Sequence, residues 1–214
     1  MPPILTLVAA DNLTDKMITM FGAIPGAGTA DRLGTRAVDI SFEKLPDRAQ
    51  IAALAHTHRL DFALQSGGNR RKKLLLADMD STMIEQECLD ELADFAGVGA
   101  EVATVTERAM RGELDFEEAL TERVARLEGL SADTCNAVLR DRLTLSAGAV
   151  TLIATMKAHG ARTVLVSGGF DIFVDAIAAR CGFQNSQANR LEVDGNGKLT
   201  GRVIPPILGR EAKA

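Results

Sequence analysis

The sequence has few of the residues that build disulfides and histidine metal sites. It contains three cysteines and three histidines in 214 residues. Cys88, Cys135 and Cys181 are widely spaced and form no CxxC pair, so we expect them to be small buried hydrophobic residues in a reducing compartment. His56 and His58 stand two positions apart, on different faces of the helix expected there. We therefore expect no histidine metal site.

Long apolar runs and an excess of positive charge are also missing. No run approaches the length of a transmembrane helix, and the N-terminus carries no basic leader, so we expect a cytoplasmic protein without a membrane partner. The net charge is −5, with 29 acidic and 24 basic residues. Because nucleic acid is bound by clustered lysine and arginine, this balance argues against a nucleic-acid partner.

The first third of the chain alternates between strand and helix patterns. We expect strands at 4–9, 37–42 and 60–64, and helices at 14–22 and 46–57, the second opened by Pro46. Residues 1–66 are therefore expected to form a small α+β domain, similar to an ACT module but without a ligand motif. Its expected role is packing or homodimerisation. Residues 67–73, with four consecutive cations at 70–73, predict a linker that forms a solvated hinge.

A short apolar run then ends in two carboxylates. Residues 74–77, Leu-Leu-Leu-Ala, predict a buried strand, and Asp78 and Asp80 follow it directly. Burying two carboxylates at a strand end is costly unless a cation lies between them. The pattern therefore predicts a hard metal ion such as Mg2+, to which a phosphate could bind. The alternative is a solvated loop in which both aspartates only cap the next helix.

Residues 83–145 have a helical pattern without a strand signal. An apolar stripe runs along the first helix, and Gly97 is placed to end it. Such a block, inserted behind the aspartates, is expected to be either a lid over the site or a rigid subdomain. The stripe consists of Cys88, Leu89, Leu92, Phe95 and Ala96.

A second strand with small residues at its end follows this block. Ser146 is expected to cap a helix that closes at Gly160, and residues 163–166 predict a buried strand. Ser167-Gly168-Gly169 then predicts a loop that leads into a helix. Backbone amides of such a loop can approach an anion where the helix begins. Residues 194–197, Asp-Gly-Asn-Gly, predict a hairpin turn.

Several motifs follow one another in a fixed order between residues 72 and 214. They are Asp78-Met79-Asp80-Ser81-Thr82, Glu87, Phe116-Glu117, Arg123, Ser167-Gly168-Gly169-Phe170-Asp171, Ala188-Asn189-Arg190-Leu191 and Lys213. In this order they resemble the phosphoserine phosphatases of the haloacid-dehalogenase-like hydrolase superfamily. The resemblance implies an α/β fold at 74–214 with a Rossmann-like parallel sheet, incomplete at the C-terminus. It also implies a helical cap insert at about 83–145.

The resemblance further implies an activity and a role for each motif. The reaction would be Mg2+-dependent hydrolysis of O-phospho-L-serine to L-serine and phosphate through an aspartyl-phosphate, the last step of serine biosynthesis. Asp78 would be the nucleophile and Asp80 the general acid and base, and both would hold the metal. The residues implied to bind substrate are Glu87, Met110, Phe116, Arg123, Ser167, Gly168 and Lys213.

One feature of that family is missing from the sequence. The family has a fourth motif, whose aspartate is the third protein ligand of the metal, but no aspartate follows Asp194 here. We expect either a fragment of a longer enzyme or a truncated product with another role, and the 214-residue chain alone to be inactive or crippled. Two alternatives stay open: a non-catalytic fragment that binds phosphoserine or serine, and a phosphatase for another small amino-acid phosphate.

Overall fold

The computed structural model describes residues 1–209 of the chain. The chain divides into two compact units, of which the first is Met1–Lys72 and the second begins at Lys73. Each unit has a hydrophobic core of its own. None of the described helices combines the length and the apolar character needed to cross a bilayer.

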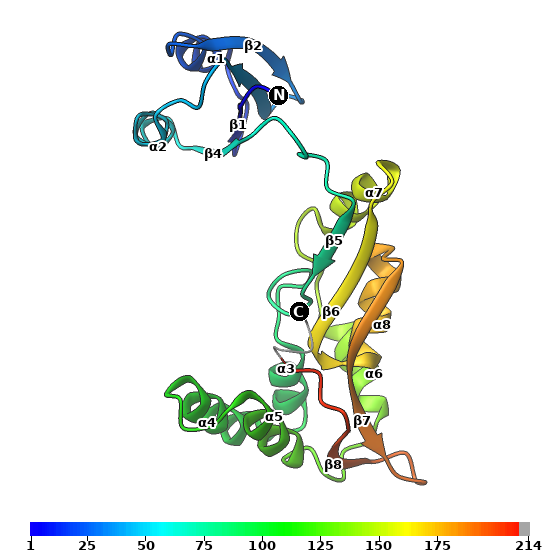
Figure 1. The fold of residues 1–214 in the computed structure, drawn as a ribbon. Helices are drawn as coiled ribbons and strands as arrows, with labels where there is room; N and C mark the ends of the chain where they lie inside the picture. Colours follow the sequence, from blue (N-terminus) through cyan, green and yellow to red (C-terminus); the bar gives the residue numbers. More distant parts are fainter. Residues whose placement is uncertain (210–214) are drawn as a thin grey trace. The chain divides into compact units, whose positions relative to one another are not determined.

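The N-terminal unit is an antiparallel sheet with two helices packed on one face. Its strand order is β2-β3-β1-β4. Leu5, Leu7, Val38 and Ile40 point from the sheet into a core that both helices share. The elements are β1 (Ile4–Ala9), α1 (Asp15–Gly22), β2 (Ala27–Arg32), β3 (Ala37–Phe42), α2 (Arg48–Thr57) and β4 (Leu60–Gln65) (Figure 1).

Both helices and three of these strands agree with the sequence prediction. The strand β2 was not predicted, because five of its six residues are exposed and show no apolar alternation. The helix α2 begins at Arg48 rather than at Pro46. Asp47 is its N-cap and accepts a hydrogen bond from the Ala49 amide at 2.8 Å. The predicted resemblance to an ACT module stays a prediction.

Arg70 binds the sheet of the N-terminal unit, which corrects the expectation of a wholly solvated hinge. Its guanidinium donates to both carboxylate oxygens of Asp39, at 2.6 and 3.0 Å, and to the Thr6 hydroxyl at 3.0 Å. Burial alone would raise the pKa of Asp39, but the hydrogen bonds from Arg70 and Thr6 hold it below its ordinary value. A bidentate ion pair of this kind fixes the chain just before the second unit begins.

Replacing Arg70 with glutamine is expected to destabilise the N-terminal unit by about 1–2 kcal/mol at pH 7, because Asp39 loses its charged donor. Since the folded pKa of Asp39 is lowered, the pair stabilises the fold above the unfolded carboxyl pKa and loses this effect as the pH falls through the folded pKa. The difference should therefore shrink in acid. Urea unfolding, followed through NMR signals of residues 1–66, measures it. The matched control is Arg71→Gln at the exposed neighbour, and equal losses in both variants would contradict the account.

The second unit is an α/β fold with a parallel sheet, as predicted. Its strand order is β5-β6-β7-β8; the first three are parallel, and β8 pairs antiparallel with β7 in a hairpin. The helices α3 to α7 lie between β5 and β6 in the chain. The helix α7 packs against β6, α8 packs against β6 and β7, and α5 contacts β8. The elements are β5 (Leu74–Ala77), α3 (Cys88–Phe95), α4 (Gly99–Met110), α5 (Phe116–Ala125), α6 (Asp133–Asp141), α7 (Ala149–Ala158), β6 (Arg162–Phe170), α8 (Asp171–Cys181), β7 (Asn185–Val193) and β8 (Leu199–Ile204) (Figure 1).

The strand β5 is not the fully buried strand that its apolar residues predict. Leu74 and Leu76 are 57% and 50% exposed, whereas Leu75 and Ala77 pack against the core. Within the described residues β5 pairs with β6 alone. An apolar run of four residues cannot distinguish a central strand from one at a sheet edge.

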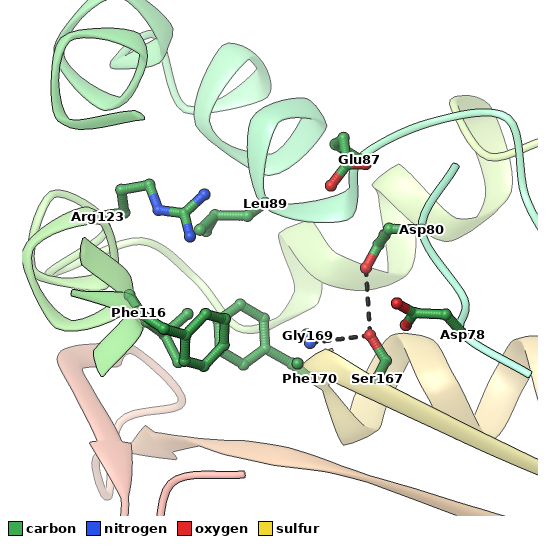
Figure 2. Close-up of a pocket in the computed structure, with 11 residues that line it drawn as sticks. Asp78, Asp80, Glu87, Leu89, Phe116, Arg123, Ser167, Gly169 and Phe170 are labelled. Atoms are coloured by element: carbon green, nitrogen blue, oxygen red, sulfur yellow. Dashed lines mark hydrogen bonds between the residues drawn. The ribbon is translucent and has the colours of Figure 1, made fainter. Parts of the chain in front are cut away.

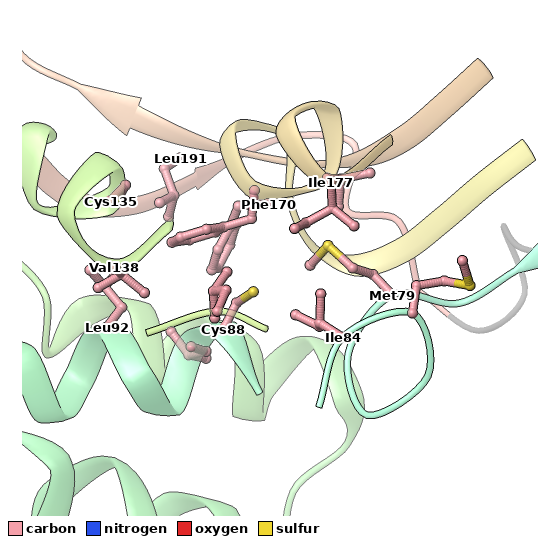
Figure 3. Packing of buried hydrophobic residues seen from close by; sticks show 14 of the residues in the cluster. Met79, Ile84, Cys88, Leu92, Cys135, Val138, Phe170, Ile177 and Leu191 are labelled. Carbon is pink, nitrogen blue, oxygen red and sulfur yellow. The ribbon is translucent and has the colours of Figure 1, made fainter. Parts of the chain in front are cut away.

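One hydrophobic cluster joins the sheet to the helical insert. Figure 3 shows Leu92 of α3 and Val138 of α6 in the same cluster as Phe170 of β6 and Leu191 of β7. All three cysteines are buried and free, as predicted. Burial raises the pKa of the Cys135 thiol to about 11, so it stays protonated at neutral pH. The shared core fixes the insert against the ends of β5 and β6.

Two local predictions in this unit are wrong. Phe95 is exposed, and Ala93 occupies the buried face of α3 in its place. Ser146 does not cap α7, because the N-cap is Gly148, whose positive φ of 85° suits glycine. The predicted hairpin at residues 194–197 is confirmed between β7 and β8.

Candidate active site

The carboxyl ends of β5 and β6 meet at one edge of the parallel sheet. Leu76 of β5 pairs with Val164 of β6, so the residues that follow Ala77 lie near those that end β6. Asp78 and Asp80 come from the first strand end, and Ser167 to Phe170 come from the second. Ligand sites in sheets of this kind form outside the carboxyl ends of the strands.

The turn after β5 is rigid because its middle residue is buried. Met79 is completely buried, and its carbonyl accepts hydrogen bonds from the amides of Thr82, Met83 and Ile84 at 3.2, 2.8 and 3.2 Å. Asp78 accepts a hydrogen bond from the Met79 amide at 2.9 Å. The alternation of acid, buried methionine and acid therefore holds both carboxylates on the side away from the core.

Asp80 has one partner in the helical insert and one on β6. Its Oδ1 accepts from the Cys88 amide, at the first turn of α3, at 2.9 Å. Its Oδ2 accepts from the Ser167 hydroxyl at 3.3 Å (Figure 2). Asp80 therefore does cap the next helix, as the alternative interpretation of the sequence proposed, and it also lines the pocket. A carboxylate at a helix N-terminus is stabilised by the free amides there.

The small residues after Val166 continue β6 rather than form the predicted loop. β6 extends to Phe170, α8 begins at Asp171, and the register with β7 shifts between Val166 and Phe170. The Ser167 hydroxyl accepts a hydrogen bond from the Gly169 amide at 2.9 Å. A Cβ on Gly169 would lie 3.2 Å from both Asp80 Oδ2 and Ser167 Oγ, so a larger residue would crowd both groups.

A pocket of about 200 Å³ opens above these strand ends. The helices α3 and α5 supply its other walls, and Figure 2 shows Arg123 across the space from the two aspartates and Glu87 near Asp80. A cavity of this size admits only a small molecule. Its lining residues are Asp78, Asp80, Glu87, Leu89, Phe116, Leu120, Arg123, Ser167, Gly168, Gly169 and Phe170.

The helical walls carry a carboxylate and a guanidinium, and both are partly withdrawn from water. Burial raises the pKa of Glu87, and the charge of Asp80 raises it further, although a 2.6 Å hydrogen bond from Ser81 opposes the shift. Burial lowers the pKa of Arg123, while Asp90 and Glu87 oppose this shift. Arginine nevertheless stays charged at neutral pH. The pocket can therefore offer a negative and a positive group to one small zwitterion.

The structure brings together seven of the nine residues predicted for the site. Met110 is an exception: it ends α4, is 84% exposed and does not line the pocket. The prediction for Met110 is therefore not supported by its position, and Lys213 lies outside the described residues. The residues brought together are Asp78, Asp80, Glu87, Phe116, Arg123, Ser167 and Gly168.

Four pocket residues were not predicted from the sequence. Gly169 and Phe170 belong to the motif that contains Ser167. The sequence therefore placed them near the site, but it did not show that they line the pocket. Leu89 and Leu120 carry no distinguishing signal, because an apolar residue at helical spacing predicts the core equally well. Leu89 was indeed expected as part of the apolar stripe of the first helix.

The carboxylates supply hard oxygen donors, but they do not form a three-ligand cluster. Among residues 1–209, no three histidine, cysteine or acidic side chains gather closely enough to hold a metal ion. Mg2+ commonly uses only one or two protein carboxylates and completes its shell with water and phosphate oxygens. The donor set around Asp78 and Asp80 is thus compatible with that ion.

The fold and the pocket together define a class of hydrolase. It has a parallel α/β sheet, two aspartates after one strand, a serine and glycines at the end of the next, and a helical insert over both. Residues 75–214 match the haloacid dehalogenase-like hydrolase family, and the chain belongs to that family.

Similar proteins of known sequence and structure extend this assignment. The chain is 45% identical over 169 residues to a phosphoserine phosphatase of Archaeoglobus fulgidus, covering 78% of the chain and 48% of that relative. It is 46% identical over 138 residues to a phosphoserine phosphatase of Albidiferax ferrireducens, covering 64% of the chain and 58% of that relative. A HAD-family hydrolase from Salmonella enterica serovar Typhi superposes with a TM-score of 0.84 at 27% identity, covering 99% of the chain and 75% of its own length. The chain spans about half the length of the curated relatives it matches.

Proposed function

We propose that the protein hydrolyses O-phospho-L-serine to L-serine and phosphate, the last step of serine biosynthesis. The observation that carries the proposal is the placement of Glu87 and Arg123 in one small pocket with Asp78 and Asp80. The first pair suits the ammonium and carboxylate of an amino acid, and the second suits a phosphate ester. The identity to curated phosphoserine phosphatases supports the same substrate.

In the proposed reaction Asp78 attacks phosphorus. A carboxylate oxygen of Asp78 forms the new P–O bond as the bond from phosphorus to the serine oxygen breaks, which gives an aspartyl-phosphate. Asp80 gives its proton to the departing serine oxygen. It then takes a proton from the water that attacks the aspartyl-phosphate, which releases phosphate and restores Asp78. One carboxyl group forms the covalent bond, and the other moves the proton.

The residues at the end of β6 would hold the phosphoryl oxygens. The Ser167 hydroxyl and the Gly168 amide are proposed donors, and Lys213 is the predicted cation. Such donors stabilise charge that develops in the transition state, because they are already oriented before the reaction begins. We propose that Mg2+ is the cofactor, held by the Asp78 carboxylate and the Asp80 backbone carbonyl. When bound, it would neutralise charge on the phosphoryl group.

The walls of the insert would bind the amino-acid part of the substrate. Glu87 would face the ammonium and Arg123 the carboxylate, where a forked guanidinium can donate two parallel hydrogen bonds. Three apolar side chains also line the pocket and would exclude water from it: Leu89, Phe116 and Leu120. Met110 has no part in this proposal because it does not line the pocket.

The N-terminal unit completes the proposal. Residues 1–66 would form an ACT-like domain that packs or forms a homodimer, with residues 67–73 as the linker. We further propose that the protein acts in the cytoplasm, with a small-molecule substrate and no nucleic-acid or membrane partner. The net charge of −5 supports the absence of a nucleic-acid partner.

Replacing Arg123 with alanine should impair the hydrolysis of a substrate that has a carboxylate far more than that of a substrate without one. For O-phospho-L-serine we expect kcat/KM to fall on the order of 100-fold, mainly through KM, because a half-buried charged donor is lost. Phosphoethanolamine has no carboxylate and should be affected only slightly. Phosphate release from both substrates is the assay, and it is made on a chain that includes the family's fourth motif.

Arg126→Ala is the matched control for this test. Arg126 lies one turn further along, pairs with Glu101 and Glu122 at the surface, and does not line the pocket. Arg126→Ala should leave kcat/KM unchanged for both substrates. Equal losses on both substrates in Arg123→Ala would mean that the arginine is structural, and the substrate assignment would fail.

A further inference from the structure

Asn189 of β7 is a buried polar residue with an unusual set of partners. It is 2% exposed, and its side chain contacts three backbone groups. Nδ2 donates to the Gly168 carbonyl at 2.8 Å and to the Leu208 carbonyl at 3.4 Å, while Oδ1 accepts from the Leu208 amide at 2.5 Å. One side chain therefore ties the end of β6 to the segment that follows β8.

The Gly168 carbonyl belongs to the same peptide group as the Gly169 amide. That amide donates to the Ser167 hydroxyl at 2.9 Å, and the hydroxyl donates to Asp80 at 3.3 Å. The peptide plane between the two glycines is thus held at both ends. A continuous chain of hydrogen bonds runs from Asn189 through this peptide and Ser167 to Asp80. In such a chain each bond strengthens and orients the next.

Asn189 does not itself reach the pocket. It is absent from the lining of the active-site pocket, and it lines a different pocket together with residues 205–208. Gly169 leaves room for Asp80 Oδ2 and the Ser167 hydroxyl, each of which would lie 3.2 Å from a Cβ at that position, but a glycine backbone is conformationally free. A segment of this kind needs an external restraint to keep its peptide in one orientation.

We infer that Asn189 is a positioning residue for the active site. It fixes the Gly168-Gly169 peptide and, through the Ser167 hydroxyl, the direction in which Asp80 presents its carboxyl group. The expected effect on kcat rests on the proposed phosphatase function. The hydrogen bonds from Asn189 to Asp80 do not depend on that function. No other residue type of this size offers a donor and an acceptor to three backbone groups in this way.

Replacing Asn189 with aspartate tests the inference. Aspartate keeps the acceptor for the Leu208 amide but places a carboxylate against the Gly168 and Leu208 carbonyls, so the peptide should rotate away. The matched control is Thr163→Val. Thr163 is a buried polar residue on β6 whose hydrogen bonds with Gln184 are remote from the pocket. If Asn189→Asp does not fold, Asn189→Ala removes the same donor without adding charge.

Two measurements distinguish positioning from simple stability. Amide hydrogen exchange by NMR should show Gly169 exchanging at least about tenfold faster in the Asn189 variant than in Thr163→Val. With O-phospho-L-serine, a displaced Ser167 and Asp80 should lower kcat by up to about 100-fold, with a smaller change in KM.

The inference would be overturned if the Asn189 variant matched Thr163→Val in Gly169 exchange and in kcat while being equally destabilised. If the unaltered protein, assayed with the family's fourth motif present, failed to hydrolyse O-phospho-L-serine, the proposed function would fail. In that case Gly169 exchange alone would still decide whether Asn189 holds the peptide.

Discussion

Asp78→Asn is expected to lose turnover of O-phospho-L-serine on the order of 10⁴-fold or more, because removal of a nucleophile eliminates the covalent route. An amide nitrogen or oxygen does not form a stable bond to phosphorus under these conditions. Asparagine has the same shape and can still accept the hydrogen bond from the Met79 amide, so the turn after β5 should persist. The loss should therefore appear in kcat without a matching loss of fold.

Phosphate release and thermal unfolding of the purified protein measure the two effects separately. Asp175→Asn serves as the control for the change in charge, since Asp175 is exposed on α8 and does not line the pocket. This control should retain full activity. Turnover that survives in Asp78→Asn would exclude Asp78 as the nucleophile.

Asp80→Asn is expected to lower kcat roughly 10²- to 10⁴-fold, the range that general acid–base groups contribute. The substitution separates the two roles of Asp80. Asparagine can still accept from the Cys88 amide and so keep the cap on α3, but it cannot give a proton to the departing serine oxygen. Activity should fall with little change in melting temperature.

Asp80→Ala removes the cap as well and should destabilise the second unit by about 1 kcal/mol. Its kcat should be as low as that of Asp80→Asn. If the asparagine variant kept normal kcat and only the alanine variant lost activity, Asp80 would be a structural cap and the proton-transfer role would be wrong.

The carboxylates and the strand ends could be predicted because their signals are local. Asp78 and Asp80 follow an apolar run directly, and Ser167-Gly168-Gly169 follows another, so short-range spacing places them at strand ends. Parallel pairing then brings the two ends together. The hairpin at residues 194–197 is predictable for the same reason, since its turn residues demand particular backbone angles.

Features that depend on distant partners could not be predicted. Leu74 and Leu76 look buried from the apolar run alone, and the open edge of β5 is expected only from the resemblance, which implies a sheet that lacks the strand of the fourth motif. Arg70 looks like one member of a solvated basic run, but its partner Asp39 is 31 residues away. Phe95 fits an apolar stripe, yet Ala93 is the residue that the core accommodates.

The side chains that the helical insert contributes to the site also could not be placed from the sequence, because their positions depend on how the helices pack. Glu87 precedes α3 and Arg123 belongs to α5, and only the packing of both helices against α4 places the two side chains around one pocket. Met110 was assigned by resemblance, whereas its exposed position at the end of α4 keeps it out of the lining. Asn189 was part of a recognised motif, but its hydrogen bonds to Gly168 and Leu208 become visible only in three dimensions.

The most direct test of the proposed mechanism is to trap the phosphorylated intermediate. The purified protein would be mixed with O-phospho-L-serine and Mg2+, quenched in acid within the first turnover, digested, and examined by mass spectrometry. The account predicts one added phosphoryl group on Asp78, absent from Asp78→Asn. Phosphate on any other residue, or steady turnover without a phosphorylated aspartate at any quench time, would contradict it.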